Sequence, residues 1–282
     1  MRTEDRRPVA VVTGAAGGIG STLVSRLVDD GHDVLAVVPL PHEPPVPPPP
    51  AARCELLMAD LTDPAGRGRA ADAVRSEFGS LDCLVNIDGL DMRSLRNDCY
   101  RRPIASAEID GAVLDRSLAI NAVAPIALVL LPLFRNGAGR ILNRGTSRTA
   151  MLRAGFLSYA MSKAALEAGS AVLARDLQGS GVTVHVLHPA GPVNTPMACG
   201  AEPELHAQLQ PACSLVVAPA RSLASPAGAS RHGQRRNTRL WRTEAPDAAF
   251  ALIASLQLEG DSASGADAAI SLNPGLVATG VE

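Results

Sequence analysis

Residues 8–20 read PVAVVTGAAGGIG, a short apolar run that ends in a glycine-rich turn. A periodic apolar stretch over 19–27 follows the turn, so the order predicts a strand, a tight connection and a helix. Gly14, Gly18 and Gly20 would let the backbone approach a pyrophosphate, which then sits against the N-terminus of the helix. The stretch therefore predicts a nucleotide site; the alternative is a plain strand–helix connection.

Further β-rich runs follow along the chain, with helical patterns between them. Strands that alternate with helices imply βαβ units and a parallel sheet covered on both faces. We therefore expect an α/β fold, with residues 1–282 forming a single Rossmann-type, doubly wound, seven-stranded parallel sheet. The predicted strands lie at about 8–14, 33–38, 56–59, 81–86, 140–143, 182–187 and 269–272, and the predicted helices at about 19–27, 64–78, 108–134, 157–178 and 246–257.

Two stretches interrupt this alternation. Residues 39–50 hold eight prolines in twelve positions, which predicts an extended loop where a crossover helix would normally lie. This loop is either inert or a ligand for a partner. Residues 198–243 predict a long loop on the substrate side, with one short helix near 203–210. Its basic side chains either bind an anionic group or are simply solvated; they are His232, Arg235, Arg236, Arg239 and Arg242.

Composition narrows the function classes. A net charge of −2 over 282 residues gives no bulk attraction to nucleic acid or to an anionic membrane. The longest apolar run, 122–134, is shorter than a membrane span, and no signal peptide is visible at the start. The five cysteines include no CxxC pair, and His185 and His188 lack a third ligand at a recognisable spacing, so no metal site is expected. We expect a cytoplasmic protein.

Tyr159 and Lys163 stand four residues apart in a good helix sequence, which places both on one face. Lys163 is the only lysine among 26 basic residues, and Tyr159 is one of two tyrosines. A neighbouring ammonium favours the phenolate and lowers a pKa that starts at about 10. Such a phenol can exchange a proton with a carbonyl or alcohol oxygen, so we predict a catalytic pair rather than an exposed helix pair.

Polar residues at two further points are candidates for the same site. Thr146, with Ser147 as the neighbouring alternative, follows the fifth predicted strand and could donate to the same substrate oxygen, or it could satisfy a turn. Asn121 lies in an apolar helix four residues before Pro125, which has no N–H to bond the Asn121 carbonyl. That carbonyl could anchor a proton-relay water; the alternative is a proline kink with a structural asparagine.

The end of the third predicted strand carries a possible adenine contact. Asp60 could accept from an adenine amino group, with Leu61 beside the ring. Alternatively, Asp60 could form a capping turn with Thr62 and Asp63 before Pro64. The two roles are compatible.

Together these residues resemble the short-chain dehydrogenase/reductase family over nearly the whole chain. The matching segments are the glycine turn at 13–20, residues 81–89, the four positions Asn121, Thr146, Tyr159 and Lys163, the loop at 189–197, and 264–275. The resemblance implies that Tyr159 is the acid/base, that Lys163 lowers its pKa and holds the ribose, that Thr146 orients the substrate oxygen and that Asn121 holds a relay water. It implies cofactor contacts at Gly14, Ala16, Gly17, Gly18, Ile19, Gly20, Asp60, Leu61, Asn86, Gly89, Tyr159, Lys163, Pro189, Val193 and Thr195.

The sequence also departs from the family pattern. Thr146 replaces the usual Ser, and Ile87 and Asp88 replace Asn and Ala, so that a carboxylate either faces away from the cofactor or binds substrate. Arg144 stands where a large apolar residue is usual. The second predicted strand ends at Val38-Pro39 with no acidic residue to repel a 2′-phosphate, so NADP(H) is favoured over NAD(H).

The resemblance implies an NAD(P)H-dependent oxidoreductase that interconverts a ketone and a secondary alcohol, acts on a small molecule and forms a homodimer or homotetramer. The unusual loops suggest a biosynthetic ketoreductase, for example on polyketide-like material. Two alternatives stay open: a dehydratase or epimerase-like enzyme in which Asp88 takes part, and a non-catalytic nucleotide-binding redox sensor.

Overall fold

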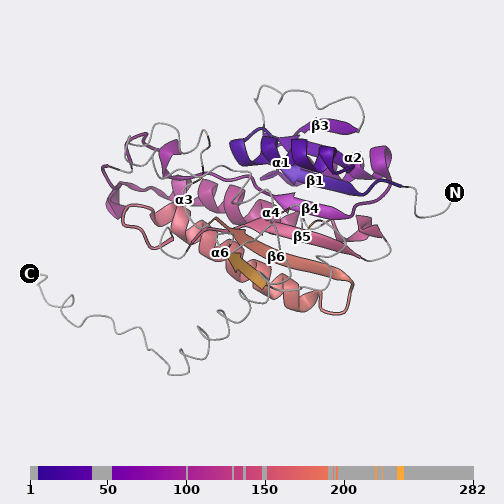
Figure 1. The fold of residues 1–282 in the computed structure, drawn as a ribbon. Coiled ribbons are helices and arrows are strands. Elements are labelled where there is room, and N and C mark those ends of the chain that lie inside the picture. The colour runs from indigo at the N-terminus through magenta and orange to yellow at the C-terminus, as the bar shows by residue number, and fades with distance from the viewer. Residues whose placement is uncertain are drawn as a thin grey trace, which may run out of the picture. The chain divides into compact units, whose positions relative to one another are not determined.

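The structure is a computed structural model of the whole chain. It describes residues 6–39, 53–99, 101–128, 130–135, 138–147, 151–189, 193, 195, 220, 224 and 234–237. These residues form a parallel sheet with helices on both faces (Figure 1). The strands are β1 (Val9–Thr13), β2 (Asp33–Val38), β3 (Cys54–Met58), β4 (Cys83–Asn86), β5 (Gly139–Arg144), β6 (Val182–His188) and β7 (Gln234–Asn237).

The strand order is β3-β2-β1-β4-β5-β6-β7, and every neighbouring pair is parallel. From β1 the chain adds β2 and β3 on one side and then crosses over to add β4 to β7 on the other side. The order of strands therefore switches between β1 and β4, where Thr13 lies opposite Asn86. In open α/β sheets, ligands bind outside the carboxyl ends of the strands at such a switch point. The doubly wound parallel fold is confirmed.

The helices follow the predicted alternation. They are α1 (Gly18–Asp29), α2 (Pro64–Ala73), the π-helix η1 (Val74–Phe78), the 3-10 turns η2 (Met92–Ser94) and η3 (Ser106–Glu108), α3 (Gly111–Leu118), the π-helix η4 (Ala119–Val123), α4 (Ala124–Ala127), the 3-10 turn η5 (Leu131–Leu133) and α6 (Leu157–Asp176). The N-terminus of α2 is capped by Asp63, whose carboxylate accepts from the N–H of Ala65 at 3.1 Å.

The helix expected over 108–134 is wrong in its extent. Its α-helical part ends at Ala127, and Leu130 has a φ of 49°. Pro132 explains the early end, because proline has no N–H and restricts the residue before it. Pro125 lies in the first turn of α4, which runs on directly from the π-helix η4, so this proline stands inside a continuous helical stretch.

The core shows why the sheet is covered on both faces. Alternate residues of β1 and β2, such as Val9, Val11 and Leu35, pack with residues of α2, α4 and α6 in one cluster. On the first two strands the intervening residues, such as Ala10 and Val12, are also fully buried. Strands buried on both faces read as continuous apolar runs, which is the pattern of VAVV at 9–12.

The seventh strand differs from the prediction. β7 comes from Gln234–Asn237, inside the region expected to be a loop, and it pairs with β6 through His185–His188. Arg235 and Arg236 are therefore strand residues. The strand predicted at 269–272, the helices at 203–210 and 246–257, and residues 40–50 of the proline-rich loop lie outside the described residues.

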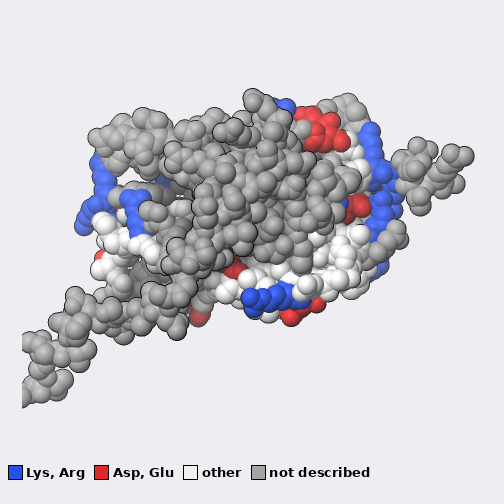
Figure 2. Space-filling view, turned by 60° about the horizontal axis from the view of Figure 1, so that its bottom comes forward, with Lys and Arg blue, Asp and Glu red and all other residues white. Residues whose placement is uncertain are grey.

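The described residues all belong to one compact unit, Met1–Arg239. Within it, Gly111–Leu133 is long and apolar enough to cross a membrane by length and composition alone, a test that the core helix of a soluble protein also passes. That stretch comprises α3, η4, α4 and η5, and its helices pack against α6. On the face in Figure 2, the basic side chains of the described residues stand in separate groups, with acidic groups among them.

Candidate active site

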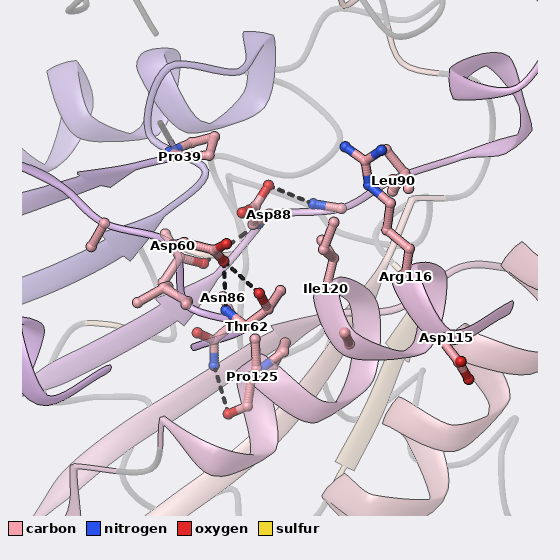
Figure 3. Close-up of a pocket in the computed structure, with 16 residues that line it drawn as sticks. Pro39, Asp60, Thr62, Asn86, Asp88, Leu90, Asp115, Arg116, Ile120 and Pro125 are labelled. Carbon is pink, nitrogen blue, oxygen red and sulfur yellow. Dashed lines mark hydrogen bonds between the residues drawn. The ribbon is translucent and has the colours of Figure 1, made fainter. Parts of the chain in front are cut away.

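A cleft opens at the carboxyl edge of the sheet, at the switch point between β1 and β4. It consists of a larger cavity of about 620 Å³ and a smaller one of about 190 Å³. Pro39, Asp88 and Gly89 line both cavities, so the two are continuous. The smaller cavity is lined by the glycine turn, Arg144 and Thr195, and the larger one by residues that include Asp60, Leu61, Asn86, Leu90, Arg116 and Ile120 (Figure 3).

The glycine turn has the geometry of a phosphate cradle. Gly14 has a φ of 64°, and a Cβ on Gly20 would lie 2.1 Å from the Gly14 carbonyl oxygen. Only glycine permits this close approach of turn to helix. Gly17 caps α1 and provides no side-chain hydrogen bond, which leaves the first-turn N–H groups to a ligand. The residues therefore fit the diphosphate of a dinucleotide.

The segment after β4 is held directly against this turn. Thr13 Oγ1 accepts from the N–H of Ile87 at 3.3 Å and of Asp88 at 3.5 Å. Asn86 lines the larger cavity, but its amide donates to Asn143 Oδ1 at 2.8 Å, and Asn143 in turn donates to Ser170 at 2.9 Å. Asn86 therefore ties β4 to β5 and α6, and its predicted cofactor contact stays a prediction.

Asp60 forms a turn with Thr62 just before α2, whereas the helix itself is capped by Asp63 and not by Asp60. Asp60 Oδ1 accepts from the N–H of Thr62 at 2.8 Å and from the Thr62 hydroxyl at 2.6 Å. These hydrogen bonds hold the pKa of Asp60 below its usual value. Asp60 lines the larger cavity (Figure 3). The buried Leu61 lines it too, so contact with an adenine stays a compatible prediction.

Tyr159 and Lys163 lie on the same face of α6, as their spacing predicts. Lys163 Nζ is 6.0 Å from the centre of the Tyr159 ring. The lysine side chain is only 1% exposed, and its Nζ donates to the Arg144 carbonyl at 2.8 Å. The tyrosine ring packs edge-on against Phe156, with the ring centres 6.4 Å apart. The sole lysine is thus buried beside the phenol at the carboxyl end of β5.

Burial, followed by the Arg144 guanidinium, lowers the pKa of Lys163 to about 7 against the smaller opposite effects of Asp88 and Glu167. With these protein groups around it, the amine is only partly protonated near neutral pH. An anionic ligand would favour the ammonium form, so its binding and lysine protonation are coupled.

The lowered pKa of Lys163 predicts that the stability of the protein depends on pH. The unfolded chain binds a proton at Lys163 up to its ordinary pKa near 10.5, whereas the folded chain releases it near 7. Between these values the unfolded state holds more protons, so stability rises with pH. We expect urea unfolding to show a gain of about 2 kcal/mol from about pH 7 to about pH 9 that the Lys163→Met variant lacks. Equal slopes in the two proteins would contradict the assignment.

Asn121 is fully buried in η4, and its side chain is held on every side. Its Oδ1 accepts from the N–H of Leu90 at 2.7 Å, and its Nδ2 donates to the Leu90 carbonyl at 2.8 Å and to Ser162 Oγ at 2.9 Å. The argument that Pro125 frees the Asn121 carbonyl assumed an α-helical register, so it does not carry over to this π-helix, where the N–H of Ala124 bonds to the Ala119 carbonyl. The relay-water role stays a prediction.

The remaining predicted residues lie at the same edge of the sheet. Thr146 is buried directly after β5, and Pro189 is buried directly after β6. Val193 is buried, and Thr195 donates from its hydroxyl to the Val193 carbonyl at 3.4 Å and lines the smaller cavity. Their predicted contacts with substrate and cofactor stay predictions.

Several side chains of the site meet at Gly89. A Cβ there would lie 3.2 Å from Asn121 Oδ1, 3.5 Å from Arg144 Nη1 and 3.7 Å from Lys163 Nζ.

Two residues of the site were not predicted from the sequence. Ser162, one residue before the lysine, holds Asn121, and its position three after Tyr159 was a usable signal. Arg116, which lines the larger cavity from α3, had none.

A glycine turn at the switch point of a parallel sheet, with a buried Tyr–Lys pair nearby, defines a Rossmann-type dinucleotide-binding protein. The sequence profile of the family described as "short chain dehydrogenase" matches residues 8–205, well over half of the chain. The chain therefore belongs to the short-chain dehydrogenase/reductase family, and it is an NAD(P)-dependent oxidoreductase that acts on CH–OH and C=O groups of small molecules.

Individual relatives agree. The 3-oxoacyl-(acyl-carrier-protein) reductase FabG of Salmonella typhimurium is 30% identical over 182 residues, which are 64% of this chain and 72% of that protein. The 1-deoxy-11-beta-hydroxypentalenate dehydrogenase of Streptomyces avermitilis is 32% identical over 204 residues, 68% of this chain and 70% of the other. A short chain dehydrogenase from Burkholderia cenocepacia, solved in complex with NADP, is similar in structure with a TM-score of 0.68 and 29% identity, covering 82% of this chain and 95% of that one.

Proposed function

We propose that this oxidoreductase interconverts a ketone and a secondary alcohol in a biosynthetic pathway, with NADP(H) as cofactor. The observation that carries the proposal is the Tyr159–Lys163 pair, buried on one face of α6, whose lysine donates to the carbonyl of the cleft-lining residue Arg144. When bound, the nicotinamide supplies or accepts a hydride. The relatives that reduce an acyl-carrier-bound 3-oxo group or oxidise a pentalenate hydroxyl support the substrate class.

Tyr159 gives a proton to the substrate oxygen during reduction and takes it back during oxidation. Lys163 in its ammonium form favours the phenolate and holds a ribose hydroxyl. Thr146 donates to the same substrate oxygen. Asn121 is held by hydrogen bonds to Ser162 and to the Leu90 backbone, and it positions that backbone next to Lys163. The glycine turn holds the diphosphate through backbone N–H groups.

The preference for NADP(H) is supported by the exit of β2. Val38 is followed by Pro39, which lines the cleft and carries no carboxylate to repel a 2′-phosphate. The test compares reduction of a panel of 3-oxoacyl thioesters and cyclic ketones with NADPH and with NADH, followed through the absorbance of the reduced nicotinamide. Turnover with neither cofactor across the panel, despite cofactor binding, would favour the redox-sensor alternative.

Replacing Asp88 with Asn is expected to tighten dinucleotide binding. The Asp88 carboxylate lies next to the glycine turn, where burial raises its pKa, and its negative charge opposes a diphosphate. The amide keeps the acceptor for the Gly89 N–H, now at 2.9 Å from Oδ1. We expect Kd for NADPH to fall about threefold to tenfold in calorimetric titrations.

The matched control is Asp115→Asn. Asp115 lines the same cleft but is exposed and points away from Asp88 (Figure 3), so its Kd should stay at the wild-type value. An Asp88→Asn protein that binds NADPH no more tightly than wild type contradicts the prediction.

Asp88 also supports the second candidate function, which is a dehydratase or epimerase-like reaction. A buried carboxyl within electrostatic reach of Lys163 is suited to proton abstraction, so a dehydratase or epimerase-like reaction keeps the same fold. Product analysis separates the two functions: a ketone reductase consumes one equivalent of reduced cofactor for each alcohol formed, whereas a dehydratase or epimerase consumes none on balance.

We also propose a homo-oligomer. The outer side of α6 exposes Leu157, Met161 and Val172, and the neighbouring η4 exposes Val123. An apolar surface of this kind on adjacent helices is suited to burial against another copy. Light scattering on the purified chain tests the proposal, and a monomer at micromolar concentration would contradict it.

A further inference from the structure

Arg144 is a charged residue of the cleft to which the proposed chemistry gives no role. It ends β5, its guanidinium lines the smaller cavity together with the glycine turn and Thr195, and no described residue accepts a hydrogen bond from its buried Nε. A buried donor of a charged group that has no partner is costly unless a ligand compensates.

This guanidinium lies close to Gly89 and to the amine of Lys163. Its Nη1 lies 3.5 Å, and Lys163 Nζ 3.7 Å, from the point that a Cβ on Gly89 would occupy. The Arg144 carbonyl is the acceptor for Lys163 Nζ. Arg144 therefore stands between the turn proposed to hold the diphosphate and the lysine proposed to hold the nicotinamide ribose, which is the part of the cleft that the nicotinamide ring must enter.

The two redox forms of the ring differ in charge. The oxidised nicotinamide is a cation, and the reduced ring is neutral. A permanent positive charge inside a partly buried cleft raises the free energy of the cationic form relative to the neutral one. Arginine keeps its charge at every accessible pH, whereas Lys163 does not, because its pKa is about 7.

We propose that Arg144 is a specificity-determining residue that makes the cleft bind the reduced cofactor in preference to the oxidised one. This inference rests on the proposed function, since it requires a nicotinamide in the cleft. Asp88 acts in the opposite sense, because its carboxylate attracts a cationic ring, but it also repels the diphosphate of either form.

The test measures Kd for NADPH, NADP⁺, NADH and NAD⁺ by calorimetry on the wild-type protein and on Arg144→Met, Arg144→Gln and Arg144→Lys. The readout is the ratio of Kd for the oxidised form to Kd for the reduced form. We expect this ratio to exceed one in the wild type, to fall about tenfold in the Met and Gln variants, and to stay near the wild-type value in the Lys variant. Two neutral replacements of different polarity keep the test open should one of them fail to fold.

The control is Arg116→Met, which removes an equal charge from the larger cavity, away from the glycine turn. It should change both Kd values by the same factor and leave the ratio unchanged. A ratio that is the same in wild type and in the folded Met or Gln variant overturns the role of Arg144 and leaves the proposed function standing. A wild-type protein that binds none of the four dinucleotides overturns the proposed function itself.

Discussion

A Tyr159→Phe protein is expected to bind the dinucleotide as tightly as the wild type and to turn over substrate about a thousandfold more slowly. The change removes one hydroxyl and keeps the ring that packs against Phe156 and Met92. The substrate oxygen keeps the proposed hydrogen bond from Thr146, but the group that exchanges the proton of the reaction is gone. Steady-state kinetics in both directions and a calorimetric Kd measure the two quantities separately.

Ser158→Ala is the matched control for this variant. Ser158 is a buried neighbour on α6 whose hydroxyl donates to Met92 Sδ at 3.1 Å, so the substitution removes one hydroxyl from the same helical turn. Its turnover should stay near that of the wild type. If the Tyr159→Phe protein keeps more than about a tenth of the wild-type turnover, Tyr159 is not the acid/base.

The second large effect is expected from Gly20→Ala. The added Cβ would lie 2.1 Å from the Gly14 carbonyl oxygen and 2.9 Å from Ala15 Cα, both backbone atoms that cannot move aside without opening the turn. We expect the variant to lose dinucleotide binding by about a hundredfold or more and to lose about 3 kcal/mol of stability. Calorimetry and urea unfolding measure these effects.

Gly68→Ala provides the comparison within a helix. Gly68 lies in α2 with nothing within 4 Å of its potential Cβ, so alanine should stabilise the helix by about 0.5–1 kcal/mol and leave cofactor binding unchanged. A Gly20→Ala protein that behaves like Gly68→Ala would show that the close approach of turn and helix is not needed for binding.

Much of the fold follows from local pattern. Six of the seven predicted strands appear within a few residues of their expected places, because a run such as VAVV can be buried only between two covered faces. The Tyr159–Lys163 geometry follows for the same local reason, since residues four apart in a helix share a face.

Two local expectations were wrong for identifiable reasons. The apolar periodicity over 108–134 suggested one long helix, but Pro132 prevents its continuation and the backbone reaches a positive φ at Leu130. The last described strand comes from QRRN at 234–237, a polar sequence with weak strand propensity. Its pairing with β6 is a tertiary contact that its own residues do not signal.

The sequence by itself determined the class of sheet, the glycine turn after its first strand and the pairing of the phenol with the amine, because each can be recognised from the pattern of single strands, one turn or one helix. Only the tertiary structure decided what surrounds the amine. Gly89, Asn121, Arg144 and Lys163 come from four separate segments and meet at one point. Strand register sets that meeting, since a shift of one residue in β5 would turn the Arg144 side chain to the other face of the sheet.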